Sequence, residues 1–215
     1  RLSGDSIAAQ SVMVDGEAAS WRMDGPDLIV TLPGERHEVT IVTTINPAAN
    51  TQLMGLYAST GMLCTQCESE GFRRITFFPD RPDVLSIYRV RMSGDKTAFP
   101  VLLSNGNCVG SGDNGDGTHW AEWHDPWPKP SYLFALVAGD LVANHSTFIT
   151  MSGRTVDLNI WVRDGDQDRK HLVQPVAAQQ FGEQVGRGEV AWVHAWVLRR
   201  SDQESACCRS ARSDP

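Results

Sequence analysis

A short polar segment, LCTQCESEGFRR at residues 63–74, concentrates several side chains that can do chemistry. Its Cys64 and Cys67 form a Cys-x-x-Cys pair, which is typical of zinc sites and of redox centres. Gln66 and Glu68 lie beside the cysteines and offer a neutral and an anionic acceptor for a cationic group. The segment therefore allows two kinds of site, one for a metal or a redox reaction and one for recognition of a cation.

A structural zinc site at the cysteine pair would need two further ligands. His119 and His124 are the nearest candidates and have an acceptable spacing, but residues 68–118 separate them from the cysteines, far more than in a zinc finger. A thioredoxin-like redox pair would need a βαβ setting with a helix after the first cysteine, and the pattern offers neither. We therefore predict that Cys64 and Cys67 are small packing residues, and we predict no metal site in this chain.

Three other stretches resemble functional motifs. HEVT at residues 37–40 begins like a zinc-protease helix motif, but residue 41 is isoleucine and the surroundings alternate as in a strand. DNGDG at residues 113–117 lacks the oxygen ligands of an EF-hand and predicts a hairpin turn. Trp120, Trp123 and Trp127 could form a stacking surface for a sugar or a base, but their strand-like spacing favours core or interface positions.

Charge and hydropathy exclude several classes of protein. The chain has 215 residues, 41% of them hydrophobic, and 26 acidic against 19 basic side chains give a net charge of -7. This charge argues against a general affinity for nucleic acid or for anionic membranes. No apolar run approaches the roughly 20 residues of a membrane helix, and the start RLSGDSIAAQ lacks the apolar region of a signal peptide. We expect a soluble, cytoplasmic protein with no nucleic acid and no membrane as partner.

Short apolar or alternating runs, broken by turn residues, dominate residues 6–162. Turn pairs such as Asp15-Gly16 and Asn105-Gly106 supply the backbone conformations that a chain reversal needs. Regular strands at this spacing, without helical periods between them, favour an antiparallel sandwich or saddle-shaped sheet over a βαβ fold. The predicted strands are residues 7–14, 28–32, 39–45, 74–78, 84–92, 99–103, 119–123, 132–137, 146–151 and 156–162.

The last part of the chain has a different character. From about residue 170 onward, Gly182, Gly186 and Gly188 interrupt any helix that the sequence could form. Residues 190–198 are compatible with a short strand or a helical turn, and the Ser/Arg-rich end is typical of disorder. We predict that residues 170–215 form a divergent, irregular tail.

Four segments carry a resemblance to a known family. They are NPAANTQLMGLYASTGMLCTQCESEGFRRITFFPDRPDVLSIYRVRM at residues 46–92, LLSNGN at 102–107, DPWPKPSYLFALVAGD at 125–140 and SGRTVDLNIWV at 152–162. In this order they closely resemble the amino-terminal part of the bacterial-type aminopeptidase N family, zinc metallopeptidases of the gluzincin class. The resemblance spans roughly residues 1–169. It implies a saddle-shaped β-sandwich domain at residues 1–140, apparently without its first strands, followed at 141–169 by the opening strands of a thermolysin-like catalytic domain.

The resemblance also implies a role for Gln66 and Glu68. In that family the matching glutamine and glutamate lie on a loop of the amino-terminal domain that reaches into the active site. Glu68 would then bind the free amino terminus of a peptide, and Gln66 would help to shape the pocket for the first side chain. An ammonium group that enters a closed pocket needs a carboxylate and polar acceptors to replace its water. Without the resemblance, Glu68 and Glu70 would be interpreted as solvated loop acids.

The catalytic motifs of the family are absent from this sequence. Neither HExxH, which holds zinc together with a downstream glutamate, nor the substrate-binding GxMEN occurs in the 215 residues. The resemblance therefore implies zinc in the complete enzyme, whereas this chain is expected to hold no cofactor and no catalytic residue and to be inactive alone. Its expected partners are a peptide amino terminus and the missing catalytic domain. The alternative is a stand-alone β-sandwich binding or protein-interaction module derived from that enzyme.

Overall fold

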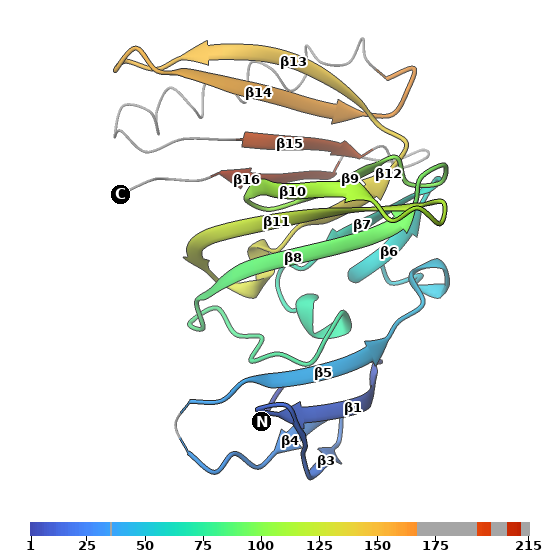
Figure 1. Cartoon of the computed structure of the whole chain (residues 1–215), viewed down its shortest axis with the longest axis vertical. Helices are drawn as coiled ribbons and strands as arrows, with labels where there is room; N and C mark the ends of the chain where they lie inside the picture. The colour runs from blue at the N-terminus through green and yellow to red at the C-terminus, as the bar shows by residue number, and fades with distance from the viewer. Residues whose placement is uncertain (35, 167–192, 199–205, 212–215) are drawn as a thin grey trace. The chain divides into compact units, whose positions relative to one another are not determined.

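The computed structural model describes residues 1–34, 36–166, 193–198 and 206–211, the last two ranges by their backbone only. In these residues the chain forms mainly antiparallel strands, joined by turns and by short 3-10 helices, and contains no α-helix (Figure 1). The prediction of a mostly β, antiparallel fold is confirmed. None of the helices in this part of the chain has the length and hydropathy of a membrane span.

The chain divides into two compact units, which are described separately. Unit 1 contains residues 1–87 and 128–137, and unit 2 contains residues 88–127 and 138–215. Each unit is therefore built from two separate segments of the chain. The predicted domain limits at residues 140 and 169 do not correspond to these units, and they remain predictions.

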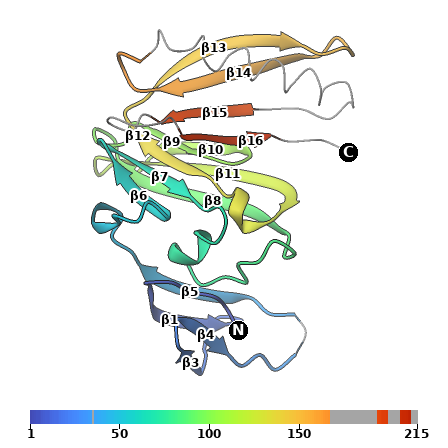
Figure 2. The same cartoon turned by 180° about the vertical axis from the view of Figure 1, so that it is seen from behind.

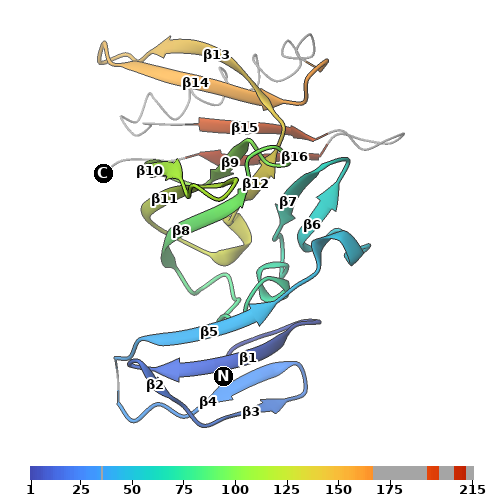
Figure 3. The ribbon, with the colours of Figure 1, turned by 45° about the vertical axis from the view of Figure 1, so that its right-hand side comes forward.

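The first segment of unit 1 supplies most of its elements. They are β1 (Ala8–Val14), β2 (Glu17–Ala18), β3 (Trp21–Asp24), β4 (Asp27–Val30), β5 (Val39–Thr44), η1 (Pro47–Ala49), β6 (Gly55–Ser59), β7 (Met62–Gln66) and η2 (Phe72–Arg74). The second segment adds η3 (Ser131–Leu133) and the beginning of β12 (Leu136–Gly139). Strand β1 lies between β2 and β5, β3 pairs with β4, and β7 pairs with β6 (Figure 3).

Apolar side chains from several elements form the core of unit 1. Val12 from β1, Leu28 from β4 and Phe77 are almost completely buried and contact one another. A second aromatic group forms around Phe72, whose ring meets those of Phe78 and Phe134 edge-on, with ring centroids 5.0 Å apart in both pairs. Edge-to-face packing of this kind stabilises aromatic pairs beyond their buried area. Phe72 thus anchors the turn η2 to the second segment of the unit.

Unit 2 contains most of β8 (Ser86–Asp95) and β11 (Thr118–Lys129), together with β9 (Val101–Ser104), β10 (Asn107–Asp113), β13 (Val142–Ile149) and β14 (Thr155–Val162). Strand β11 lies between β10 and β8, as the view from behind also shows (Figure 2). Successive side chains of a strand point to opposite faces of the sheet, so buried and exposed residues alternate. Along β8, Tyr88 and Met92 are buried, whereas Arg89 and Arg91 are exposed.

The tryptophans of β11 have separate roles. Trp123 is buried in the core of unit 2, and its Nε1 donates a hydrogen bond to the carbonyl oxygen of Leu102 at 3.1 Å. Trp120 lies on the other face of the strand, under the guanidinium of Arg91, which is 4.0 Å from the centre of its ring. The ring also passes close to Gly112 of β10, where a Cβ would lie 2.9 Å from the indole Nε1. Trp123 is therefore a core aromatic, the interpretation that its spacing favours.

Strand β14 connects β13 with two later strands of unit 2. It pairs antiparallel with β13 over eight residue pairs and parallel with β15 (Val193–Leu198), which pairs antiparallel with β16 (Ala206–Ala211). Both late strands lie in the range 170–215, for which the sequence predicts an irregular tail with at most a short element at residues 190–198. The other residues of that range lie outside the described residues.

Two predicted strands are wrong, although most are confirmed within a few residues. Residues 74–78 form no strand, because the 3-10 helix η2 (Phe72–Arg74) overlaps their start and Phe78 makes only an isolated bridge to Ser3. The predicted strand at residues 132–137 divides into η3 and the start of β12. In both places buried aromatic side chains, Phe77 and Phe134, produce an apolar run without strand backbone. The sequence prediction also missed β2, β3, β6, β7, β10 and β16.

Candidate functional site

The hairpin of β6 and β7 positions the segment that holds the predicted site residues. Its turn is formed by Thr60 and Gly61, both with positive φ, of 48° and 80°. Two successive residues with positive φ are typical of the tight turns whose twist matches that of paired strands. The register places Gly55 opposite Gln66, so Gln66 is the last residue of β7.

The segment that follows β7, residues 67–71, is here called the 67–71 loop. Cys67 is buried at its start and Gly71 at its end, whereas Glu68, Ser69 and Glu70 between them are exposed. The backbone N–H of Gly71 donates to the carbonyl oxygen of Cys67 at 2.8 Å and closes the loop. The peptide bond between Glu68 and Ser69 is cis. The loop therefore presents three polar residues from a base with two buried ends.

The structure brings the two predicted site residues together. The Nε2 of Gln66 donates a hydrogen bond to the backbone carbonyl oxygen of Glu68 at 3.3 Å. The carboxylate of Glu68 is exposed, and it makes no hydrogen bond or ion pair with any other residue that the structure describes. A carboxylate in this state can accept hydrogen bonds from a cationic group that approaches from solvent.

The cysteine pair lies where β7 leads into this loop. Cys64 is fully buried in β7, and Cys67 is 3% exposed. In the part of the chain that the structure describes, no three His, Cys, Asp or Glu side chains come close enough to hold a metal ion. Within the described residues, the donor groups therefore do not fit a zinc ion, and Cys64 and Cys67 have the buried positions expected of packing residues.

Two close backbone approaches determine where the loop returns. A Cβ at Gly71 would lie 2.3 Å from the carbonyl oxygen of Gln66, and 3.0 Å from the backbone nitrogen of Gly55. A Cβ at Gly55, which has a φ of +75°, would lie 2.8 Å from the Cβ of Arg74. Only glycine allows such contacts. The loop consequently folds back against the end of the β6–β7 hairpin.

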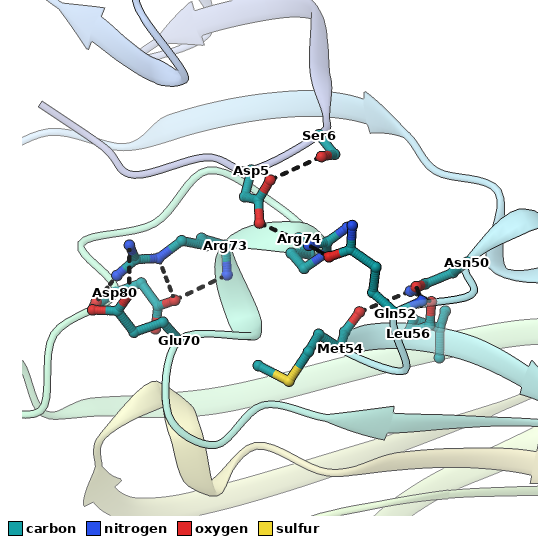
Figure 4. Close-up of polar contacts among 10 residues, drawn as sticks. All are labelled: Asp5, Ser6, Asn50, Gln52, Met54, Leu56, Glu70, Arg73, Arg74 and Asp80. Atoms are coloured by element: carbon teal, nitrogen blue, oxygen red, sulfur yellow. Dashed lines mark hydrogen bonds and ion pairs between the residues drawn. The ribbon is translucent and has the colours of Figure 1, made fainter.

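Arg73, in the turn η2 just after the loop, connects the loop to a buried carboxylate (Figure 4). Its Nε and its backbone N–H each donate to Oδ2 of Asp80 at 3.0 Å, and its Nη2 donates to the Asp80 carbonyl oxygen at 2.8 Å. Its Nη1 lies 3.2 Å from Oε2 of Glu70. The second carboxylate oxygen of Asp80 accepts a hydrogen bond from the hydroxyl of Ser131.

Arg74 secures the same turn from its other side. Its Nη1 donates to Oδ2 of Asp5 at 2.8 Å and to Oε1 of Gln52 at 2.6 Å (Figure 4). Nearby, the amide nitrogen of Asn50 donates to the carbonyl oxygens of Met54 at 2.7 Å and Leu56 at 3.0 Å. These contacts connect the chain start and the segment before β6 to η2.

The hydroxyl of Thr65 ties β7 to β12. It accepts a hydrogen bond from the N–H of Leu136 at 2.9 Å and lies 3.4 Å from the carbonyl oxygen of the same residue. The strand that ends in Gln66 is therefore held on both sides, by β6 and by β12.

The sequence analysis proposed Gln66 and Glu68 as site residues, and it gave no supporting role to the residues that the structure places around them, namely Glu70, Gly71, Arg73, Asp80 and Ser131. Nothing in the local sequence pairs Asp80 with Arg73, seven residues earlier, or with Ser131 in the second segment of unit 1. The run EGFRR does carry one usable signal, a glycine directly before a buried aromatic residue and two arginines.

The fold is that of a mostly β domain, which presents an exposed carboxylate on a loop with buried ends. The Peptidase M1 N-terminal domain family matches residues 6–133, and the chain belongs to that family. The chain is 50% identical over 172 residues to aminopeptidase N of Haemophilus influenzae and 48% identical over 170 residues to that of Escherichia coli. It covers 20% of each of these proteins, with 78% and 79% of its own length. The chain thus spans a fifth of the length of these curated relatives.

Solved structures of peptidases are also similar to this chain. Legionella pneumophila aminopeptidase A, in complex with aspartic acid, is similar with a TM-score of 0.74 and 31% identity, over 78% of this chain and 20% of that protein. An M1 zinc metallopeptidase of Deinococcus radiodurans, bound to a Tyr-Ser-Ala substrate, is similar with a TM-score of 0.72 over 94% of this chain and 49% of that protein. At 16% identity, the second comparison shows a shared fold.

Proposed function

We propose that this chain is the amino-terminal substrate-recognition part of a zinc-dependent aminopeptidase, which removes amino-terminal residues from peptides. In this proposal the carboxylate of Glu68 binds the α-ammonium group of the peptide, and Gln66 borders the pocket for the first side chain. The observation that carries the proposal is an exposed carboxylate with no partner among the described residues, presented by a loop whose two ends are buried. A preorganised acceptor of this kind binds a cation without first giving up another contact.

The zinc ion and the catalytic groups of the proposed enzyme would come from outside this chain. HExxH is absent from the sequence, and the donor groups near Cys64 and Cys67 do not fit a metal. What this chain would contribute is discrimination, because a carboxylate that binds the free amino group selects the end of a peptide over an internal bond. The cytoplasmic location expected from the sequence remains a prediction.

The test replaces Glu68 with Gln in a complete aminopeptidase whose amino-terminal segment has this sequence. A charge-assisted hydrogen bond contributes about 1.5–3 kcal/mol, so kcat/KM for an amino-acid amide should fall by about 10- to 100-fold. The matched control is Glu17→Gln, because Glu17 is an exposed glutamate on β2, far from Glu68 in the sequence. This control should leave kcat/KM unchanged.

A second measurement isolates the ammonium group itself. Inhibition by an amino-acid hydroxamate should weaken in the Glu68→Gln enzyme, because this inhibitor has the free amine. Inhibition by acetohydroxamate, which has the same zinc-binding group but no amine, should not change. A folded Glu68→Gln enzyme with normal kcat/KM, or with equal losses for both inhibitors, would contradict the proposed role of Glu68.

A second candidate function, a protein-interaction module that acts alone, has one observation in its favour. Leu85, just before β8, and Ile87, the second residue of β8, are 58% and 57% exposed. Exposed apolar side chains close together favour contact with a protein partner. The same residues would serve in contact with a catalytic domain. Sedimentation of the purified chain separates the two possibilities, because a self-sufficient module should be folded and monodisperse.

A further inference from the structure

Arg73 is held more tightly than a surface arginine. Four of its contacts are made to two carboxylate residues, with three hydrogen bonds to Asp80 and one ion pair to Glu70 (Figure 4). The side chain of Asp80 is 1% exposed, whereas that of Arg73 is 21% exposed. Because a buried carboxylate cannot lose its cationic partner without a large desolvation cost, Arg73 must remain at Asp80.

Ser131 strengthens this arrangement from the second segment of unit 1. Its hydroxyl donates to the carboxylate oxygen of Asp80 that Arg73 does not use. Ser131 is 1% exposed, so this hydrogen bond lies in the interior of the unit. With both oxygens bonded, Asp80 has a single orientation, and the guanidinium of Arg73 is directed accordingly. Its Nη1 is then presented to the 67–71 loop at a definite position.

Glu70 is the residue of the 67–71 loop that meets this fixed group. Its Oε2 lies 3.2 Å from Nη1 of Arg73, and its side chain is 66% exposed. Exposed ion pairs stabilise a fold little, mainly because two long side chains must both be ordered. Here only Glu70 needs to be ordered, since Asp80 already orders Arg73. The pair can therefore restrain the loop without being important for folding.

We propose that Glu70 is a positioning residue for Glu68, which lies two residues earlier in the same loop. The inference rests on the proposed role of Glu68 in binding the peptide amino group. Three contacts would then restrain the segment around Glu68: the Gln66 amide on its carbonyl oxygen, the closing bond from Gly71 to Cys67, and the Glu70–Arg73 ion pair. Of these three contacts, only the Glu70–Arg73 ion pair uses a side chain of the 67–71 loop.

Glu70 differs from Glu68 in what its charge does. The charge of Glu70 faces Arg73, whereas the carboxylate of Glu68 has no ion pair among the residues that the structure describes. Glu70 thus acts through the loop and does not bind the substrate. Loss of its charge should loosen the geometry at Glu68, which lowers affinity for the ammonium group before it affects the bond-breaking step.

The experiment is a double-mutant cycle in the complete aminopeptidase that has this amino-terminal sequence, with Glu68→Gln, Glu70→Gln and both together. Glu70→Gln should raise KM for an amino-acid amide about two- to fivefold, the range of an exposed ion pair, with kcat nearly unchanged. In the Glu68→Gln enzyme, the same substitution should have no further effect on KM, because no carboxylate remains to be positioned.

The matched control is Asp83→Asn. Asp83 also pairs with an arginine, Arg81, at 3.0 Å, and both side chains are about two-thirds exposed. This substitution removes an exposed ion pair of the same kind outside the loop and should not change KM. The melting temperature of each variant shows whether the enzyme is folded, and Glu70→Gln should leave it within a few degrees of the unsubstituted enzyme.

The outcomes separate the two proposals. A large effect of Glu68→Gln, combined with an equal rise in KM from Glu70→Gln in both backgrounds, would overturn the positioning role and leave the proposed function standing. An unchanged KM in the Glu70→Gln enzyme would also overturn the positioning role of Glu70 and leave the proposed role of Glu68 standing. If Glu68→Gln itself has no effect, both the role of Glu68 and the positioning role of Glu70 are wrong.

Discussion

The acidic side chains of this chain differ in what surrounds them. Asp80 is buried and fully engaged, Glu70 is exposed but paired with Arg73, and Glu68 is exposed without a partner among the described residues. A carboxylate of the first kind contributes to structure, since its loss would leave polar partners buried without a hydrogen bond. A carboxylate of the last kind is available to a ligand. This difference supports the assignment of recognition to Glu68 alone.

A second paired carboxylate, Asp113 in unit 2, yields a pH-dependent prediction. A hydrogen bond from the ammonium of Lys96 is the main cause that holds the pKa of Asp113 below its ordinary value of 3.8, and the N–H of Gly115 assists at 2.7 Å. Because the folded pKa lies below the unfolded one, the stabilisation is complete above about pH 4 and is lost as the pH falls through the folded pKa.

Replacing Lys96 with Met should raise the pKa of Asp113 toward its ordinary value and reduce the loss of stability in acid. The N–H of Gly115 remains, so some lowering of the pKa should persist. Carboxyl resonances followed by NMR during an acid titration measure the change directly. Asp15 is the control, because the imidazole of His37 and the N–H of Glu38 lower its pKa. An unchanged pKa at Asp113 would show that Lys96 is not the cause.

At the scale of elements, the connection from β7 to η2 depends on backbone contacts. Gly71 has a φ of -82°, which any residue can adopt, so its requirement comes from space and not from backbone conformation. The carbonyl oxygen of Gln66 occupies the place that a side chain would need. The end of β7 and the start of η2 can therefore come together only when this residue is glycine.

Gly71→Ala should destabilise the chain by about 1–3 kcal/mol, the usual cost of inserting an atom where none fits. Urea unfolding should show a lower midpoint with an unchanged slope. Gly94→Ala in β8 is the control, because its Cβ would meet the ring of Phe99 at 3.5 Å, an ordinary contact distance. The control should stay within about 0.5 kcal/mol of the original chain. Equal effects of both substitutions would contradict the argument from space.

At the scale of the whole molecule, the chain spans a fifth of the curated relatives that it matches. The proposed division of labour assigns recognition to this chain and bond breaking to residues outside it. Such a division is physically reasonable, because binding energy contributed by one domain can orient a substrate at the reactive groups of another.

The purified chain should therefore release no product from a fluorogenic amino-acid amide, with or without added zinc. The sequence lacks HExxH, so neither the metal-activated water nor the general base of such enzymes can be supplied. Metal analysis of the purified chain should find less than one zinc ion per molecule. Zinc-dependent release by this chain would show that it builds a metal site of its own, and Cys64 and Cys67 would then be the first residues to substitute.

The sequence by itself predicted the mostly β fold class correctly, and its family resemblance made Gln66 and Glu68 the candidate site residues. Turn residues between short alternating runs define strands locally, and Gln66 and Glu68 lie only two residues apart in one of the segments that carry the resemblance, so both features can be found in short stretches of sequence. It placed residues 74–78 in a strand incorrectly, because an apolar run has the same appearance in a strand and in a turn anchored by aromatic rings. Only the tertiary structure decided which carboxylate is engaged and which is exposed. That distinction depends on Arg73, Asp80 and Ser131, which come together through long-range packing that local sequence does not encode.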